Sequence, residues 1–223
     1  TVSTTNGFGI YRLNYTAGAT AANRTFKHGL GGAPNLIIVK RPDTTEDWYI
    51  SSKTWSASSG CTSGAYLNSQ NSQSRFDNTD AAECTWNTYD STTIRGGSTG
   101  GVHECDVYAF RAISGKSAFG VYTGNTPSTV EITGFGFRPD MVIIRCTDST
   151  DGGGNAWTIV DSVRSTSDPR NERLWINYDY EAATNSNYGI DFDTDGITIS
   201  ASTASYGLNS SGLQYTYLAF KMD

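Results

Sequence analysis

The sequence predicts an all-β protein made of two tandem β-sandwich units of jelly-roll type. Short runs of β-branched and aromatic residues alternate with turn formers along the chain, which contains 24 Gly and 13 Tyr. Such a density of short strands and turns is typical of sandwiches. No window shows a sustained apolar period of about 3.6 residues, so we expect almost no helix. Segments of the first half also recur in the second half, which indicates an internal duplication.

The repeat is weak in identity but consistent in order. The matched segments are 8–11 with 119–122, 29–40 with 134–145, 47–50 with 156–159, 66–68 with 175–177, 90–94 with 195–199, and 108–110 with 218–220. The boundary falls near Gly115, so we predict a first domain over residues 1–115 and a second over residues 116–223. Whether the two units are separate sandwiches or one fused body stays open.

Each unit carries the same succession of strand signals. A Gly-rich turn leads to Pro34 or Pro139, and the fixed φ and missing N–H of proline suit the start of a strand. The four apolar residues that follow predict a strand buried on both faces or nearly so. The segments around Trp48 and Trp157 alternate as half-buried strands do. Asp195-Gly196 lies between two such runs and predicts a hairpin.

The charge balance argues against two classes of protein. Charged residues make up 17% of the chain, the net charge is −6, and no block of Lys and Arg occurs. Binding to nucleic acid requires clustered cations, so we expect no nucleic-acid partner. Apolar runs such as 36–39 and 141–144 are too short to span a bilayer, and no signal segment opens the chain. Because it begins at Thr1, we expect a processed product or a fragment of a longer protein.

The four cysteines fall into two kinds of segment. Cys61 and Cys84 lie in one Ser/Asn-rich stretch and are candidates for a disulfide. Cys105 and Cys146 lie in apolar strand-like runs and are expected to be buried thiols. No Cys-x-x-Cys motif occurs, which argues against a structural zinc site.

No residue pattern marks an active site. His28 lies beside a Gly-rich turn and His103 at the start of a strand, and neither has a nucleophile in a recognisable motif. Position 28 aligns with Thr133, so the repeat does not require a histidine there. Sugar cleavage would need two acids that face one cleft, and nothing marks such a pair among Asp47, Asp140, Asp161 and Asp191. We therefore expect no enzyme, no catalytic residue and no cofactor.

Three aspartates form a candidate calcium site. Asp191, Asp193 and Asp195, followed by Gly196, spell the D-x-D-x-D-G start of a calcium loop. Alternate carboxylates around a turn present the hard oxygens that Ca²⁺ prefers. Ser202 stands at the twelfth position, where an EF-hand requires a bidentate acid. We favour a polar strand that leads into an Asp-Gly hairpin.

Aromatic residues in loop-like segments are the remaining candidates for binding. Their faces can stack on sugar rings or fill a protein interface, although several are expected to pack in the core. The candidate binding-surface residues are Trp55, Trp86, Tyr89, Tyr178, Tyr180, Tyr188 and Tyr206.

The matched segments resemble a repeat domain of marine and cyanobacterial phage structural proteins. The resemblance rests on Gly7-Phe8 with Ile10, on the stretch His-Gly-Leu-Gly-x-x-Pro-x-x-Ile-Ile-Val-Lys over 28–40, and on Asp47-Trp48. The second half continues it through 119–125, 134–139, Trp157 and the closing 217–220. It covers nearly the whole chain. A departure is the pair Asp161 and Arg164, which has no equivalent near Lys53 and is either a structural ion pair or a surface pair worth little.

The resemblance implies a non-enzymatic structural protein on the surface of a bacteriophage virion. We expect a capsid decoration or head-surface protein that stabilises or caps the particle, with major capsid or tail subunits as partners. The alternative is a tail-fibre or receptor-binding module that recognises host surface glycans through the loop aromatics. A homo-oligomer fits either alternative, and membrane insertion fits neither. Capsid or tail location, host, receptor and oligomeric state stay open.

Overall fold

The computed structural model describes residues 1–15, 25–43, 45, 47–52, 64–68, 88–95, 103–147, 156–179, 181–184, 189–200 and 208–222. Every helix or strand assigned in this part of the chain is a strand, which confirms the predicted all-β class. None of its segments is a helix long and apolar enough to cross a membrane. The chain divides into two compact units between Ile113 and Ser114, beside the predicted boundary at Gly115.

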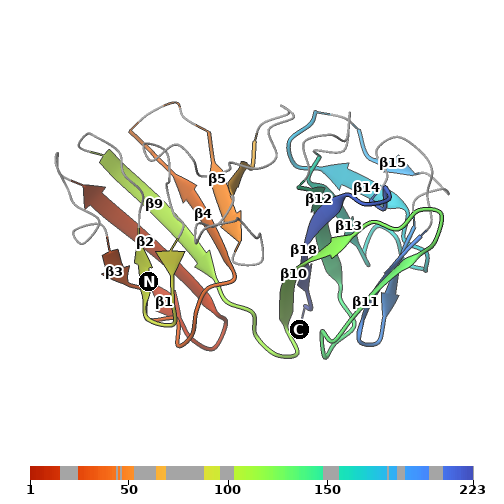
Figure 1. The fold of residues 1–223 in the computed structure, drawn as a ribbon, viewed down its shortest axis with the longest axis horizontal. Helices are drawn as coiled ribbons and strands as arrows, with labels where there is room; N and C mark the ends of the chain where they lie inside the picture. Colours follow the sequence, from red (N-terminus) through yellow and green to blue (C-terminus); the bar gives the residue numbers. More distant parts are fainter. Residues whose placement is uncertain are drawn as a thin grey trace. The chain divides into compact units, whose positions relative to one another are not determined.

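The first unit contains two antiparallel sheets (Figure 1). Its strands are β1 (Val2–Ser3), β2 (Phe8–Tyr15), β3 (Thr25–Lys27), β4 (Leu36–Lys40), β5 (Tyr49–Ser52), β6 (Gly64–Tyr66), β7 (Thr88–Tyr89), β8 (Thr93–Arg95) and β9 (His103–Phe110). The large sheet has the order β1-β2-β9-β4-β5-β6 and the small sheet the order β3-β8-β7.

The second unit is likewise built from a large and a small antiparallel sheet. Its strands are β10 (Ser117–Thr123), β11 (Val130–Thr133), β12 (Met141–Cys146), β13 (Thr158–Asp161), β14 (Glu172–Trp175), β15 (Ala183–Thr184), β16 (Ile190–Asp193), β17 (Gly196–Ile199) and β18 (Gln214–Phe220). The large sheet has the order β10-β18-β12-β13-β14-β15 and the small sheet the order β11-β17-β16.

The two units share one strand order. The run β2-β9-β4-β5-β6 corresponds to β10-β18-β12-β13-β14, and β3-β8-β7 corresponds to β11-β17-β16. The register of the central strands agrees as well, because Ile37 lies opposite Ala109 and Val142 lies opposite Ala219. This common topology supports the predicted duplication.

The first strand of each unit departs from the predicted alignment. Phe8 pairs with Phe110, whereas Ser117, and not Phe119, pairs with the corresponding Phe220. The match of 8–11 with 119–122 is therefore two residues out of register with the sheets. A shift of two residues keeps each side chain on the same face, because the side-chain period of a strand is two.

Each unit has its own core between its two sheets, which is the packing of a β-sandwich. In the second unit, Val142, Ile144 and Val160 of the large sheet belong to one buried cluster with Phe192 and Ile197 of the small sheet. Each such side chain contributes roughly 1.5–3 kcal/mol on burial. The core of the first unit is formed in the same way by residues that include Leu30, Ile37, Val39, Ile94, Cys105, Val107 and Ala109.

Several local predictions are confirmed. Leu36, Ile37 and Val39 of the predicted apolar strand are buried, and Cys105 and Cys146 are buried thiols. Strands β16 and β17 form the predicted hairpin, with Asp193 paired to Gly196. Gly196 thus opens the second strand, where a Cβ would overlap a backbone carbonyl oxygen of β11.

Candidate functional site

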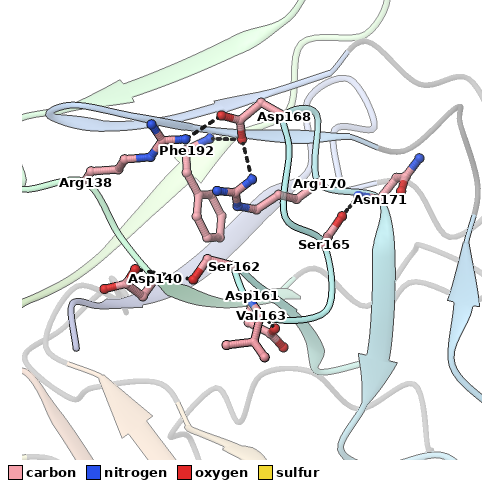
Figure 2. Close-up of polar contacts among 10 residues, drawn as sticks. All are labelled: Arg138, Asp140, Asp161, Ser162, Val163, Ser165, Asp168, Arg170, Asn171 and Phe192. Carbon is pink, nitrogen blue, oxygen red and sulfur yellow. Dashed lines mark hydrogen bonds and ion pairs between the residues drawn. The ribbon is translucent and has the colours of Figure 1, made fainter. Parts of the chain in front are cut away.

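A network of charged side chains holds the segment that joins β13 to β14 in the second unit (Figure 2). Asp168 lies at its centre. One of its carboxylate oxygens, Oδ2, accepts a hydrogen bond from Nη2 of Arg138 at 2.6 Å. The other, Oδ1, accepts the backbone N–H of Phe192 at 2.9 Å and lies 3.0 Å from Nη1 of Arg170. A single carboxylate thus ties this segment to the turn before β12 and to β16.

Arg170 is buried beneath this carboxylate. Its side chain is 5% exposed, and its guanidinium carbon lies 4.5 Å from the centroid of the Phe192 ring. Its backbone N–H and C=O bond to Ile190 at 2.9 and 3.0 Å. The contact with Asp168 is an ion pair without the alignment of a hydrogen bond. The cation thus lies against the Asp168 carboxylate and one aromatic face, and its charge also acts on Asp191.

The turn after β13 is fixed by a second carboxylate. Asp161 accepts the backbone N–H groups of Val163 and Arg164 at 3.1 and 2.9 Å, and Nε of Arg164 at 2.7 Å. Burial opposes ionisation of Asp161, but the hydrogen bonds and charge of Arg164 hold its pKa below the usual value. The pair singled out in the sequence is thus a structural ion pair within the turn.

The same turn presents an exposed apolar side chain. Val163 is 77% exposed, and Met222 at the end of the large sheet is 55% exposed. The backbone at both residues is held by a carboxylate: Asp161 accepts the N–H of Val163 at 3.1 Å, and Asp140 accepts the N–H of Met222 at 2.9 Å and a hydrogen bond from Oγ of Ser162 at 3.3 Å. Apolar groups held on a fixed backbone are suited to contact another surface.

The three candidate calcium ligands serve different purposes in the structure. Asp195 accepts the N–H groups of Gly134 and Gly136 at 3.2 and 2.6 Å, and Asp193 accepts Oγ1 of Thr198 at 2.8 Å. Burial, followed by the charges of neighbouring carboxylates, raises the pKa of Asp191. No group of three potential metal ligands comes together within the described ranges. The arrangement agrees with the favoured hairpin interpretation.

Most of the other predicted site residues lie outside the described part of the chain. These residues are Trp55, Trp86, Tyr180, Tyr188, Tyr206, Cys61 and Cys84. Tyr89 belongs to β7, and Tyr178 follows β14 and is half-buried. The candidate disulfide and the aromatic patch therefore stay predictions.

His28 has a structural role. It is buried, its Nδ1 accepts the N–H of Leu30 at 3.1 Å, and its Nε2 lies 3.2 Å from the carbonyl oxygen of Asp90. Because Nδ1 accepts, Nε2 carries the proton and donates. The hydroxyl of Tyr11 donates to the carbonyl oxygen of His28 at 2.5 Å. His28 directly follows the last residue of β3.

Sequence reasoning missed the cluster around Asp168 and a second buried arginine. Arg145 has no exposed surface, and its guanidinium carbon lies 5.2 Å from the centroid of the Trp157 ring. Burial lowers the pKa of Arg145 to about 10, against smaller raising effects of Cys146 and Tyr178. One signal was available for the cluster, since Arg138 occupies the position that alanine holds in the first repeat.

Comparison with known proteins gives a single family. No curated protein and no solved structure matches the chain. A family model described as Domain of unknown function (DUF7483) matches residues 1–223. Because that match spans the sequence from end to end, the chain belongs to the DUF7483 family.

Proposed function

We propose that this protein is a non-enzymatic structural protein of a bacteriophage virion, which decorates the capsid surface and stabilises or caps the particle. The main support comes from the hydrogen bonds that the aspartates of the second unit accept. Asp161, Asp168 and Asp195 each accept backbone N–H groups and so fix turns. Carboxylates committed in this way support a scaffold better than they support acid–base catalysis.

A fixed scaffold suits a protein on the outside of a particle. Such a protein must resist unfolding and proteolysis, which begin at loosely held backbone. Asp161 accepts the N–H of the exposed Val163 and Asp140 accepts the N–H of the exposed Met222, so little side-chain and loop ordering is required when they meet a protein surface. Major capsid subunits are the partner that this proposal names, and the resemblance noted in the sequence supports the virion assignment.

Single-particle reconstruction of the virion that carries the chain tests the proposal. We expect density for the two units on the outer capsid shell, with Val163 at or beside a capsid contact. Density on the tail would replace decoration by the fibre alternative, and binding of host glycans would then be measured. Absence of the chain from the particle would remove the virion assignment.

A further inference from the structure

One long edge of the second unit's large sheet is open. Strand β10 stands first in the order of that sheet and pairs with β18 (Figure 1). Among the residues that the structure describes, no strand pairs with the other edge of β10. The opposite end of the sheet is β15, which has only two residues, whereas β10 has seven.

The register identifies the backbone groups that face this edge. The N–H of Gly124 donates to the carbonyl oxygen of Leu213 at 2.8 Å, so the even-numbered residues of β10 bond to β18. In an antiparallel ladder, the residues between them point their N–H and C=O groups to the other side. Phe119, Val121 and Thr123 therefore present these groups to the open edge.

The equivalent edge of the first unit is covered over residues 8–10. Strand β1 pairs with β2, with Ser3 opposite Phe8. Beside this pair, Thr1 and Ile10 exchange two hydrogen bonds of 2.9 and 2.8 Å. The residues that precede β10 cannot cover it in this way, because they form β9 of the first unit and the turn that follows. The fold thus has a place for one more strand beside β10.

The sequence of β10 lacks the features that prevent an edge strand from pairing with a strand of another chain. Natural edge strands are protected by charged side chains, proline, bulges or shortness. Strand β10 reads Ser-Ala-Phe-Gly-Val-Tyr-Thr and contains neither a charged residue nor proline. Its counterpart β2, by contrast, carries Arg12. Strand β10 is therefore suited to pair with another strand.

We propose that β10 pairs antiparallel with β10 of a second copy of this chain, centred on Gly120. In that register Phe119 of each copy lies opposite Val121 of the other, and each such pair exchanges two backbone hydrogen bonds. Aromatic residues opposite β-branched residues stabilise antiparallel strands, and no like charges meet. The contact is self-complementary, as a two-fold interface requires, and it joins two six-stranded sheets into one. It does not depend on the virion assignment.

Substitution of Val121 by proline tests this interface. The N–H of Val121 faces the open edge, so proline removes no hydrogen bond to β18. Sedimentation equilibrium of the full chain is expected to show a dimer, and V121P to weaken the dimer more than tenfold. The matched control is Arg12→Pro, at the corresponding outward position of β2, which should dimerise as the unchanged chain does.

Two further measurements keep the test decisive if V121P fails to fold. Val121→Lys should also give monomers, and mixing it with Phe119→Glu should restore dimers, because the mixed pair places Lys opposite Glu in the proposed register. Exchange of the amide hydrogens of Phe119 and Val121 should slow as the concentration of the chain rises. The proposal is overturned if the chain stays monomeric at several hundred micromolar, or if a dimer forms equally well in both Val121 variants.

Discussion

Removal of the Asp168 carboxylate is expected to destabilise the second unit. Asp168→Ala takes the acceptor from the N–H of Phe192 and the counter-ion from Arg170, whose side chain is buried. Loss of one partner of a buried pair costs roughly 3–5 kcal/mol. The Asp168 side chain is itself 31% exposed, so water reaches the site and the lower half of that range applies. We expect a loss of about 3 kcal/mol for Asp168→Ala.

Three companion variants separate the contributions. Asp168→Asn keeps an oxygen for the N–H of Phe192 but removes the charge, so it should cost about 2 kcal/mol. Arg138→Ala removes the outer partner, which is 50% exposed, and should cost less than about 1 kcal/mol. Adding Arg170→Met to Asp168→Ala should recover stability, because the buried cation is then gone.

Urea unfolding of the full chain measures these differences. Each unit has its own core, so the unfolding of each is followed with a probe specific to that unit. The change in stability is read from the shift of the urea midpoint, provided that the dependence of the free energy of unfolding on urea stays the same. The transition of the first unit is the internal control and should not move. The reasoning is refuted if Asp168→Ala stays within about 0.5 kcal/mol of the unchanged chain, or if Arg138→Ala costs as much.

Three other substitutions probe the same logic elsewhere. Asp191→Asn should stabilise the second unit at neutral pH by less than about 1 kcal/mol, because burial and neighbouring carboxylates raise the pKa of Asp191. The gain should shrink as the pH falls and vanish below about pH 3, where the acid is protonated in both the folded and the unfolded state; urea titrations at neutral pH and below about pH 3 would show this. His28→Ala should lower the free energy of unfolding of the first unit by about 2–3 kcal/mol, because it removes the hydrogen-bond partner of the N–H of Leu30 and of the carbonyl oxygen of Asp90. An unchanged unfolding transition of the first unit would contradict this. Gly196→Ala should cost the second unit more than about 3 kcal/mol, since its Cβ would overlap a carbonyl of β11; Thr194→Ala in the same hairpin is the near-neutral control.

Local sequence signals predicted the strands because burial repeats along a strand with a fixed period. The apolar run of β4 and the Asp-Gly hairpin each carry their signal within a few residues, and both are confirmed. The alignment of 8–11 with 119–122 failed for the opposite reason. Local identity favoured it, but the pairing of Phe8 with Phe110 and of Ser117 with Phe220 sets the register, and pairing depends on strands far away in the sequence.

The charged cluster was beyond sequence reasoning for the same physical reason. Arg138 and Asp168 are separated by 30 residues, and only the folded sheet brings them together. Burial of Arg145 likewise depends on where Trp157 lies across the sheet. Charged side chains carry no periodic signal, since nearly all of them are expected at the surface. Their partners follow from register and loop paths, which single residues do not specify.

The two Gly-rich turns keep the same backbone conformation at matched glycines, although the residues that accept their N–H groups differ. Both turns contain glycines with positive φ, Gly29 and Gly31 in one unit and Gly134 and Gly136 in the other, so their N–H groups point away from regular strand partners. In the first unit Nδ1 of His28 accepts the N–H of Leu30. In the second unit, Asp195 of the β16–β17 hairpin supplies the acceptors: its backbone carbonyl for the N–H of Phe135, and its carboxylate for those of Gly134 and Gly136. Alignment of His28 with threonine suggested that the repeat does not need this histidine. The fold needs the acceptor rather than the residue, and so a position that varies between the halves still carries stability.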